Sequence, residues 1–179
     1  MTTWIALFRG INVGGKNVLP MAALRSGLAS LDLQNVRTYI QSGNAVFDGA
    51  DDDAQTLKQR ITSWIRSQYG YEPALQLLTP AQLQAAVDGN PYADATDKPN
   101  TLHLFFLATA AGDADTQALQ SACADTEDFM LTDEVFYLHA PDGIGRSRLA
   151  ANAERYLGVS VTARNLRTVT KLLQMVTTG

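Results

Sequence analysis

The stretch VRTYIQSGNAVF, residues 36–47, decides how this chain folds. Its first half alternates in polarity, which is typical of a β-strand. One strand face is expected to pack against a core and carries Val36, Thr38 and Ile40. The opposite face carries the polar groups of Arg37, Tyr39 and Gln41. Gly43-Asn44 stands between two strand-like runs, a pattern typical of a two-residue hairpin turn, so residues 45–47 are predicted to return antiparallel.

The polar face of this strand is also a candidate ligand site. It presents a guanidinium, a phenol and an amide in a row that ends at Ser42 and Asn44. These groups suit a polar ligand, and they equally suit water on a solvated sheet face. Both interpretations remain open at this point.

The elements around the hairpin follow the order strand, helix, strand, strand, helix, strand. Residues 3–8 are almost all apolar and predict a strand buried on both faces, and a helix after Pro20 has leucines at three- and four-residue spacings. A second helix is expected to begin near the aspartates at 51–53 and to end at Gly70, before a strand at 75–78. This is the split βαβ order of a ferredoxin-like unit.

The same order recurs in the second half of the chain. After a short helix at 80–87, the pattern predicts a strand at 101–108, a helix at 115–124, a hairpin from two short strands, and three further elements. The hairpin strands are expected at residues 129–131 and 135–139. The chain is therefore predicted to be α+β, with two ferredoxin-like halves, residues 1–90 and 91–179, packed into one compact unit.

Composition places the chain among globular proteins. It has 179 residues, of which 46% are hydrophobic, and it has no apolar run near the roughly 20 residues that span a bilayer. The amino-terminal segment lacks the pattern of a secretory signal, so a cytoplasmic location and no membrane partner are expected. Cys123 has no second cysteine to pair with, and with only His103 and His139 beside it we expect no metal site.

Charge is distributed unevenly along the chain. The net charge of −4 combines +3 in residues 1–47, −12 in residues 48–142 and +5 in residues 143–179. If the two basic ends meet between the halves, they form a positive cleft that attracts a small anionic ligand. The alternative is that acidic helices only keep the protein in solution. The acidic middle and the scarcity of basic residues among aromatics argue against a nucleic-acid partner.

The most specialised loop is the glycine-rich stretch RGINVGGKN, residues 9–17. Glycine allows main-chain N–H groups to converge in turns with positive φ, and the flanking Arg9 and Lys16 supply positive charge for an anion. The stretch also departs at one position from the Walker A pattern, because Asn17 replaces the hydroxyl residue that ligates magnesium. No strand ends in a Walker B aspartate, so NTP hydrolysis is the weaker alternative. A purely structural turn is the other.

The last helix offers a second anion site. Asn165 is predicted to cap its first turn, where N–H groups and the helix dipole favour a negative ligand. Its exposed side is expected to carry Arg164, Arg167, Thr168 and Lys171. An ordinary solvated basic helix explains the same pattern. Ser147 is predicted to cap the preceding helix and is not read as a nucleophile.

Three blocks of the sequence resemble a known family. They are Phe8–Asn17, Asn35–Asn44, and Thr162–Asn165 followed by Thr168–Leu172. Together they are similar to the signatures of an uncharacterised bacterial family catalogued as domain of unknown function 1697. The resemblance implies two ferredoxin-like α+β halves, and it implies no known activity, substrate, cofactor or catalytic residue. Leu166 is a departure, since the family pattern leads us to expect an aromatic residue there.

From these observations we expect a protein that binds a small phosphorylated or carboxylated ligand, nucleotides included, in a basic cleft between its halves. The candidate ligand-binding residues are Arg9, Asn12, Gly14, Gly15, Lys16, Arg37, Tyr39, Gln41, Ser42, Asn44, Arg164, Asn165, Thr168 and Lys171. The alternative is a regulatory or scaffolding module, not an enzyme, that binds a protein partner through a sheet face. Neither enzymatic activity, a cofactor nor an oligomeric state follows from the residues.

Overall fold

The computed structural model describes residues 1–50 and 53–177. Asp51 and Asp52, expected in the first turn of a helix, lie outside the described residues. The chain divides into two compact units. The first contains residues 1–83 and the chain from Leu172 onward, and the second contains residues 84–171. The division predicted at residue 90 stays a prediction about domains.

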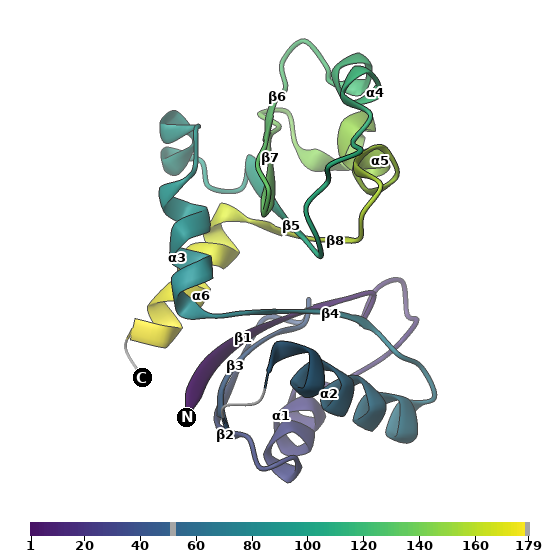
Figure 1. Cartoon of the computed structure of the whole chain (residues 1–179), viewed down its shortest axis with the longest axis vertical. Helices are drawn as coiled ribbons and strands as arrows, with labels where there is room; N and C mark the ends of the chain where they lie inside the picture. Colours follow the sequence, from purple (N-terminus) through teal and green to yellow (C-terminus); the bar gives the residue numbers. More distant parts are fainter. Residues whose placement is uncertain (51–52, 178–179) are drawn as a thin grey trace. The chain divides into compact units, whose positions relative to one another are not determined.

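The first unit is a four-stranded antiparallel sheet with two helices on one face (Figure 1). Its elements are β1 (Thr2–Arg9), α1 (Met21–Ser30), β2 (Gln34–Tyr39), β3 (Asn44–Gly49), α2 (Ala54–Tyr69) and β4 (Ala74–Leu78). The strand order β2-β3-β1-β4 is that of the predicted ferredoxin-like unit.

Alternation along the strands creates the core of this unit. Every second residue of β1, from Trp4 to Phe8, belongs to one buried cluster with residues of β3 and β4 and with the apolar stripes of α1 and α2. The helices approach closely because α1 has Gly27 at the crossing. A β-carbon on Gly27 would lie 1.9 Å from Cζ2 of Trp64 in α2, so no larger residue fits without movement.

Two residues set the limits of α2. The sequence predicts the end at Gly70, whereas Asp53, expected in the first turn, lies just before the helix as its N-cap. The Asp53 carboxylate accepts hydrogen bonds from the N–H groups of Gln55 and Thr56, both at 2.9 Å. Gly70 ends the helix in the left-handed conformation, with φ of 75°.

The second unit repeats the architecture, with the strand order β6-β7-β5-β8 and all neighbours antiparallel. Its elements are β5 (Leu102–Leu107), α4 (Thr116–Ala122), β6 (Asp128–Leu131), β7 (Val135–His139), α5 (Arg148–Leu157) and β8 (Val161–Asn165). Two further helices, α3 (Pro80–Asp88) and α6 (Leu166–Thr177), have residues in both units. Short 3₁₀ helices cover Ala93–Asp97 and Ile144–Arg146. The predicted α+β class with two similar halves is confirmed.

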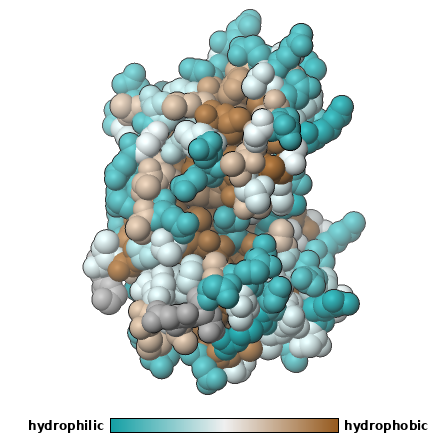
Figure 2. All heavy atoms as spheres, in the orientation of Figure 1, coloured by the Kyte–Doolittle hydropathy of each residue, from teal (hydrophilic) through white to brown (hydrophobic). Residues whose placement is uncertain are grey.

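The second core lies between this sheet and the helices α4 and α5 (Figure 1). Phe105 and Phe136 meet edge to face on adjacent strands, with ring centroids 5.5 Å apart. Leu149, Ala153 and Leu157 of α5, each four residues from the next, are buried in the same cluster. On the face seen in Figure 2, hydrophilic side chains occur over the whole face, with hydrophobic ones showing between them.

The hairpin differs from its prediction at one end. Strand β2 stops at Tyr39, and residues 40–43 form a four-residue loop, so Asn44 is the first residue of β3 and not part of a two-residue turn. The antiparallel return is confirmed. Ile40, expected on the packed face, is instead 49% exposed, because its φ of 49° takes the chain out of the extended conformation.

No helix in residues 1–50 and 53–177 combines the length and the apolar character needed to cross a bilayer.

Candidate functional site

The glycine-rich loop is a small closed hairpin. Val13 and Lys16 pair across Gly14-Gly15, and the Lys16 N–H donates to the Val13 carbonyl at 3.0 Å. Gly14 and Gly15 both have positive φ, 58° and 72°, the pairing that a tight hairpin turn requires. A phosphate-binding loop leads straight into its helix at the lysine, whereas α1 begins only at Met21. The loop therefore lacks the shape of a Walker A site.

Two asparagine side chains hold this hairpin at its base. Asn12 donates from its amide to the carbonyls of Leu19 at 2.9 Å and Gln41 at 3.0 Å, and it accepts from the Leu19 N–H at 2.8 Å. Asn17 donates to the Gly10 carbonyl at 2.9 Å. Both asparagines have positive φ. Both amide hydrogens of Asn12 are thus used within the chain.

The bond from Asn12 to Gln41 joins the glycine-rich loop to the loop at residues 40–43. A second link is the Phe8 N–H, which donates to the Gly43 carbonyl at 2.8 Å. A β-carbon at Gly43 would lie 2.7 Å from Cδ1 of Ile11, so the two loops are in close contact. We call residues 9–19 and 40–43 the loop surface. It brings together most of the predicted ligand-binding residues of the first unit.

These residues occupy different depths. Arg9, Gly14, Gly15, Lys16, Gln41 and Ser42 are exposed. Asn44 is fully buried, and its amide donates to the Tyr39 carbonyl and to Oγ of Ser42, both at 3.1 Å. Asn44 therefore closes the hairpin and does not face a ligand.

The exposed part of the loop surface includes three aliphatic side chains. Among the described residues, the exposed large hydrophobic side chains are Met1, Val13, Val18, Ile40 and Met130. Three of these five belong to the loop surface, with exposed fractions of 66% for Val13, 56% for Val18 and 49% for Ile40. The sequence analysis did not identify this cluster.

Arg37 lies on β2, away from the loop surface. Its guanidinium donates through Nη1 to the Met175 carbonyl near the end of α6, so it ties the sheet edge to that helix within the first unit. Its Nε is buried and has no hydrogen-bond partner among the described residues. With Asn35, Val36 and Asp48 it lines a pocket of about 320 Å³.

The residues predicted around the last helix lie where β8 meets α6. Asn165 accepts from the Thr168 N–H at 3.0 Å, which confirms the predicted cap. Thr168 is buried, so its expected exposure was wrong, because it lies between the buried Leu166 and Val169 in the first turns of α6. Burial lowers the pKa of Arg164 to about 10, which still leaves it charged at neutral pH. Lys171 is exposed. Lys16 and Arg164 belong to different units, and their predicted meeting stays a prediction.

A groove between α4 and α5 is the site that sequence analysis missed. It has a volume of about 390 Å³ and is lined by Asp115, Ala118, Ser121, Ala122, Arg148, Arg155 and Tyr156. Arg148 and Arg155 are seven residues apart on α5, hence on one face, a spacing that could have indicated the site. We call it the α4–α5 groove.

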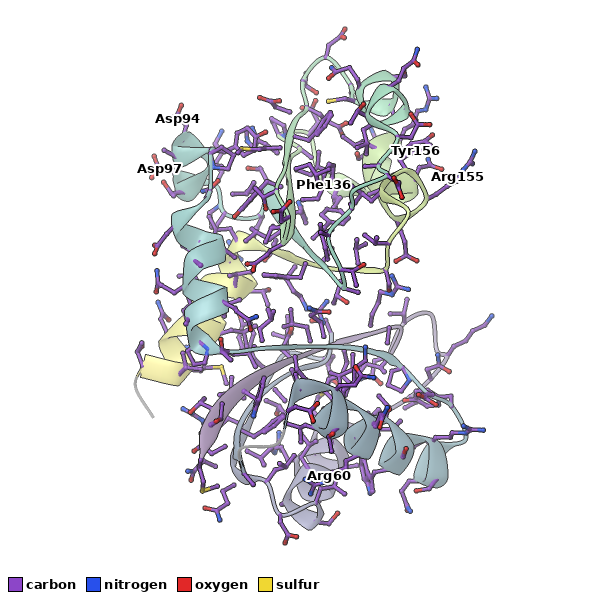
Figure 3. The ribbon with its side chains drawn as sticks, viewed as in Figure 1. Arg60, Asp94, Asp97, Phe136, Arg155 and Tyr156 are labelled. Carbon is purple, nitrogen blue, oxygen red and sulfur yellow. The ribbon has the colours of Figure 1, made fainter. Side chains whose placement is uncertain are left out.

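Main-chain bonds fix the walls of the α4–α5 groove. The Asp115 N–H donates to the Tyr156 carbonyl at 2.8 Å, and the Asp115 carboxylate caps α4 by accepting from the Ala118 N–H at 2.9 Å. The Arg155 guanidinium carbon lies 5.7 Å from the centroid of the Tyr156 ring, within cation–π range. Figure 3 shows Arg155 and Tyr156 projecting from α5.

Neither arginine of the α4–α5 groove forms an ion pair within residues 1–50 and 53–177. An ion pair on the first unit joins Arg66 to Glu72 at 3.7 Å. Ser147 caps α5 by accepting from the Ala150 N–H at 3.0 Å, as predicted, and so places Arg148 at the first position of the helix. The groove thus holds two guanidinium groups against one carboxylate.

Nucleophilic and metal-ligating groups do not gather elsewhere in the described part of the chain. Burial and the nearby Glu127 and Asp128 raise the pKa of the Cys123 thiol, which keeps it protonated. Burial lowers the pKa of His103, which keeps it neutral, and its Nδ1 has no hydrogen-bond partner among the described residues. No cluster of three or more potential metal-ligating side chains occurs among the described residues.

Comparison with known proteins agrees with this fold. Among solved structures, the chain is similar to a conserved bacterial protein from Streptococcus pneumoniae, with a TM-score of 0.72 and 25% sequence identity, over 97% of this chain and 98% of that chain. No curated protein sequence matches the chain. A family model described as protein of unknown function, DUF1697, matches residues 1–137, which include the blocks Phe8–Asn17 and Asn35–Asn44. The chain therefore belongs to the DUF1697 family.

Proposed function

We propose that this protein binds a small phosphorylated or carboxylated ligand in the α4–α5 groove. The observation that carries the proposal is the pair Arg148 and Arg155, which line one groove without a carboxylate partner among the described residues. Both arginines are exposed on one side of α5, and guanidinium forks match the oxygens of phosphate and carboxylate groups.

The other lining groups favour a ligand that carries hydroxyl groups besides its anion. One oxygen of the Asp115 carboxylate caps α4 and the second can accept from a hydroxyl. Ser121 donates its hydroxyl hydrogen to the Gln117 carbonyl at 2.8 Å, so its oxygen is an acceptor toward the groove. Sugar phosphates and nucleotides have this combination of an anionic group and hydroxyl donors.

The α4–α5 groove supports this role better than the loop surface does. In the loop surface the amide hydrogens of Asn12 are used within the chain, and exposed valines flank Lys16. The groove combines charge with concavity, and Tyr156 adds an aromatic wall. We therefore retain the expectation that the protein binds an anion, and we propose the α4–α5 groove of the second unit as the site in place of a cleft between the halves.

A thermal-shift screen tests the proposal with inorganic phosphate, pyrophosphate, nucleoside monophosphates, sugar phosphates and dicarboxylates as probes. A ligand at a hundred times its dissociation constant adds about 2.7 kcal/mol to the free energy of unfolding. We expect at least one probe to stabilise the wild type and to lose its effect in the double variant Arg148→Gln, Arg155→Gln.

Arg146→Gln is the matched control, because Arg146 is exposed next to α5 and does not line the groove. Its response to the same probe should equal that of the wild type. An unchanged response in the groove double variant, or no response to any probe in the wild type, would overturn the proposal.

A further inference from the structure

We propose that the loop surface docks an acidic segment of a partner protein that carries aliphatic side chains. This function is separate from ligand binding in the α4–α5 groove, since the loop surface belongs to the first unit and the groove to the second. The inference begins from Val13, Val18 and Ile40, which are exposed on two loops joined by hydrogen bonds.

Packing in the core does not explain why Val13 and Val18 are apolar. Ile11 and Leu19, in the same loop, are buried and anchor it, whereas Val13 and Val18 are more than half exposed. Single exposed aliphatics are ordinary on protein surfaces, but a cluster on one small surface marks an interaction site.

The backbone conformation of Ile40 is a second, independent observation that favours a binding role for this surface. A β-branched residue at φ of 49° is strained, and an asparagine or a glycine would relieve that strain. The side chain is half exposed, so packing does not account for an isoleucine here. Strained residues are retained mainly where the side chain serves recognition or catalysis.

The charge of the loop surface selects the chemistry of the partner. Arg9 and Lys16 are exposed, and residues 9–19 and 40–43 contain no aspartate or glutamate. A positive surface with aliphatic contacts is complementary to a segment in which Asp or Glu alternates with Leu, Ile or Val.

A lipid surface fits the loop surface less well. Membrane-docking surfaces are rich in tryptophan and tyrosine, and residues 9–19 and 40–43 contain neither. Residues 48–142 carry a charge of −12, which an anionic bilayer repels.

The loop surface is also prepared for docking. Asn12 makes three hydrogen bonds to Leu19 and Gln41, and Tyr71 donates to the Asn17 carbonyl at 2.9 Å, so both loops are fixed before a partner arrives. A surface that is already ordered loses little conformational entropy on binding.

The experiment selects peptides from a random phage-displayed library on the immobilised full-length protein and measures the affinity of the enriched peptides by fluorescence anisotropy. We expect enriched peptides to contain Asp or Glu beside Leu, Ile or Val. Their affinity should fall about tenfold or more in Ile40→Asn and in Val13→Ser, as for residues that dominate an interface. It should also fall in Lys16→Gln and with added salt.

Met130→Ser is the matched control, because Met130 is another exposed hydrophobic residue, 43% exposed, on β6 of the second unit. It should leave peptide affinity unchanged. The Ile40→Asn chain is expected to fold at least as well as the wild type, so its loss of binding reports the surface and not unfolding.

Four outcomes would overturn the proposal. The first is a selection without enrichment, and the second is peptides that bind Ile40→Asn as tightly as the wild type. The third is co-sedimentation with phosphatidylserine vesicles that Ile40→Asn abolishes, which assigns the surface to lipid. The fourth is a concentration-dependent dimer that Ile40→Asn dissociates, which assigns it to a second copy of the chain.

Discussion

The side-chain amide of Asn12 donates to the main-chain carbonyl of Gln41 across 3.0 Å, and so joins two loops that are 29 residues apart in the sequence. The same side chain holds Leu19 through two further bonds. One residue therefore fixes the shape of the loop surface.

Asn12→Ala is expected to lower the free energy of unfolding by about 2 kcal/mol, because the carbonyls of Gln41 and Leu19 and the Leu19 N–H lose their partner. Urea denaturation measures the loss. Asn12→Asp keeps the acceptor toward Leu19 and removes both donors, so its stability should lie between those of the wild type and Asn12→Ala. A loss no larger than about 0.5 kcal/mol in Asn12→Ala, the size of an ordinary surface substitution, would show that the loops do not depend on this residue.

Ile40→Asn is expected to raise the free energy of unfolding by about 1 kcal/mol, since asparagine tolerates the left-handed conformation that isoleucine resists. Ile40→Val retains the β-branch and should leave stability nearly unchanged, which makes it the control. If Ile40→Asn destabilises the chain instead, the isoleucine side chain contributes to packing and its strain has a structural explanation.

Gly27→Ala is expected to cost about 3 kcal/mol through overlap with Trp64, more than the gain of about 1 kcal/mol in helix propensity. Adding Trp64→Leu should recover part of this loss by opening the crossing of α1 and α2. Ser26 is exposed and lies next to Gly27 in α1, so Ser26→Ala is the control for the change in helix propensity. Equal stability of Gly27→Ala and wild type would contradict the close packing described at this crossing.

The Asp48 carboxylate is expected to make the free energy of unfolding depend on pH in the acid range. Hydrogen bonds from Asn35 at 2.7 Å and Thr3 at 2.6 Å lower its pKa below the ordinary value of 3.8, and the charge of Arg37 lowers it further against the opposing effect of burial. Because the folded-state pKa lies below the unfolded value, this stabilisation is fully present above the ordinary pKa and is lost as the pH falls through the folded-state pKa.

The difference in stability between wild type and Asp48→Asn should therefore be constant near neutral pH and shrink below about pH 4. Thermal unfolding across this range measures it. A difference that does not change with pH would mean that the Asp48 charge is not held by these partners.

Local patterns predicted the fold well because its determinants are local. The polar alternation before Gly43, the helix end at Gly70 and the caps at Ser147 and Asn165 each act within a few residues, and all four features were confirmed. The left-handed conformation of Ile40 could not be predicted, since β-branched residues favour extended backbone and the loop is held by links to distant residues such as Phe8, Ile11 and Asn12.

The α4–α5 groove depends on tertiary structure in the same way. Ser121 lies on α4 and Arg148 on α5, 27 residues apart, and no sequence spacing relates them. Only the helical repeat from Arg148 to Arg155 was visible in the sequence. The exposure of Val13 was equally hidden, because an apolar residue in a loop is commonly read as part of the core.

The most direct test of the ligand site is a calorimetric titration of pyrophosphate into the full-length protein at low salt. Pyrophosphate offers two anionic groups to the two guanidinium groups of Arg148 and Arg155. The account predicts saturable one-to-one binding to the wild type and to Arg146→Gln, and no measurable binding to Arg148→Gln, Arg155→Gln. Binding of equal affinity in the double variant, or no binding to the wild type, would contradict it.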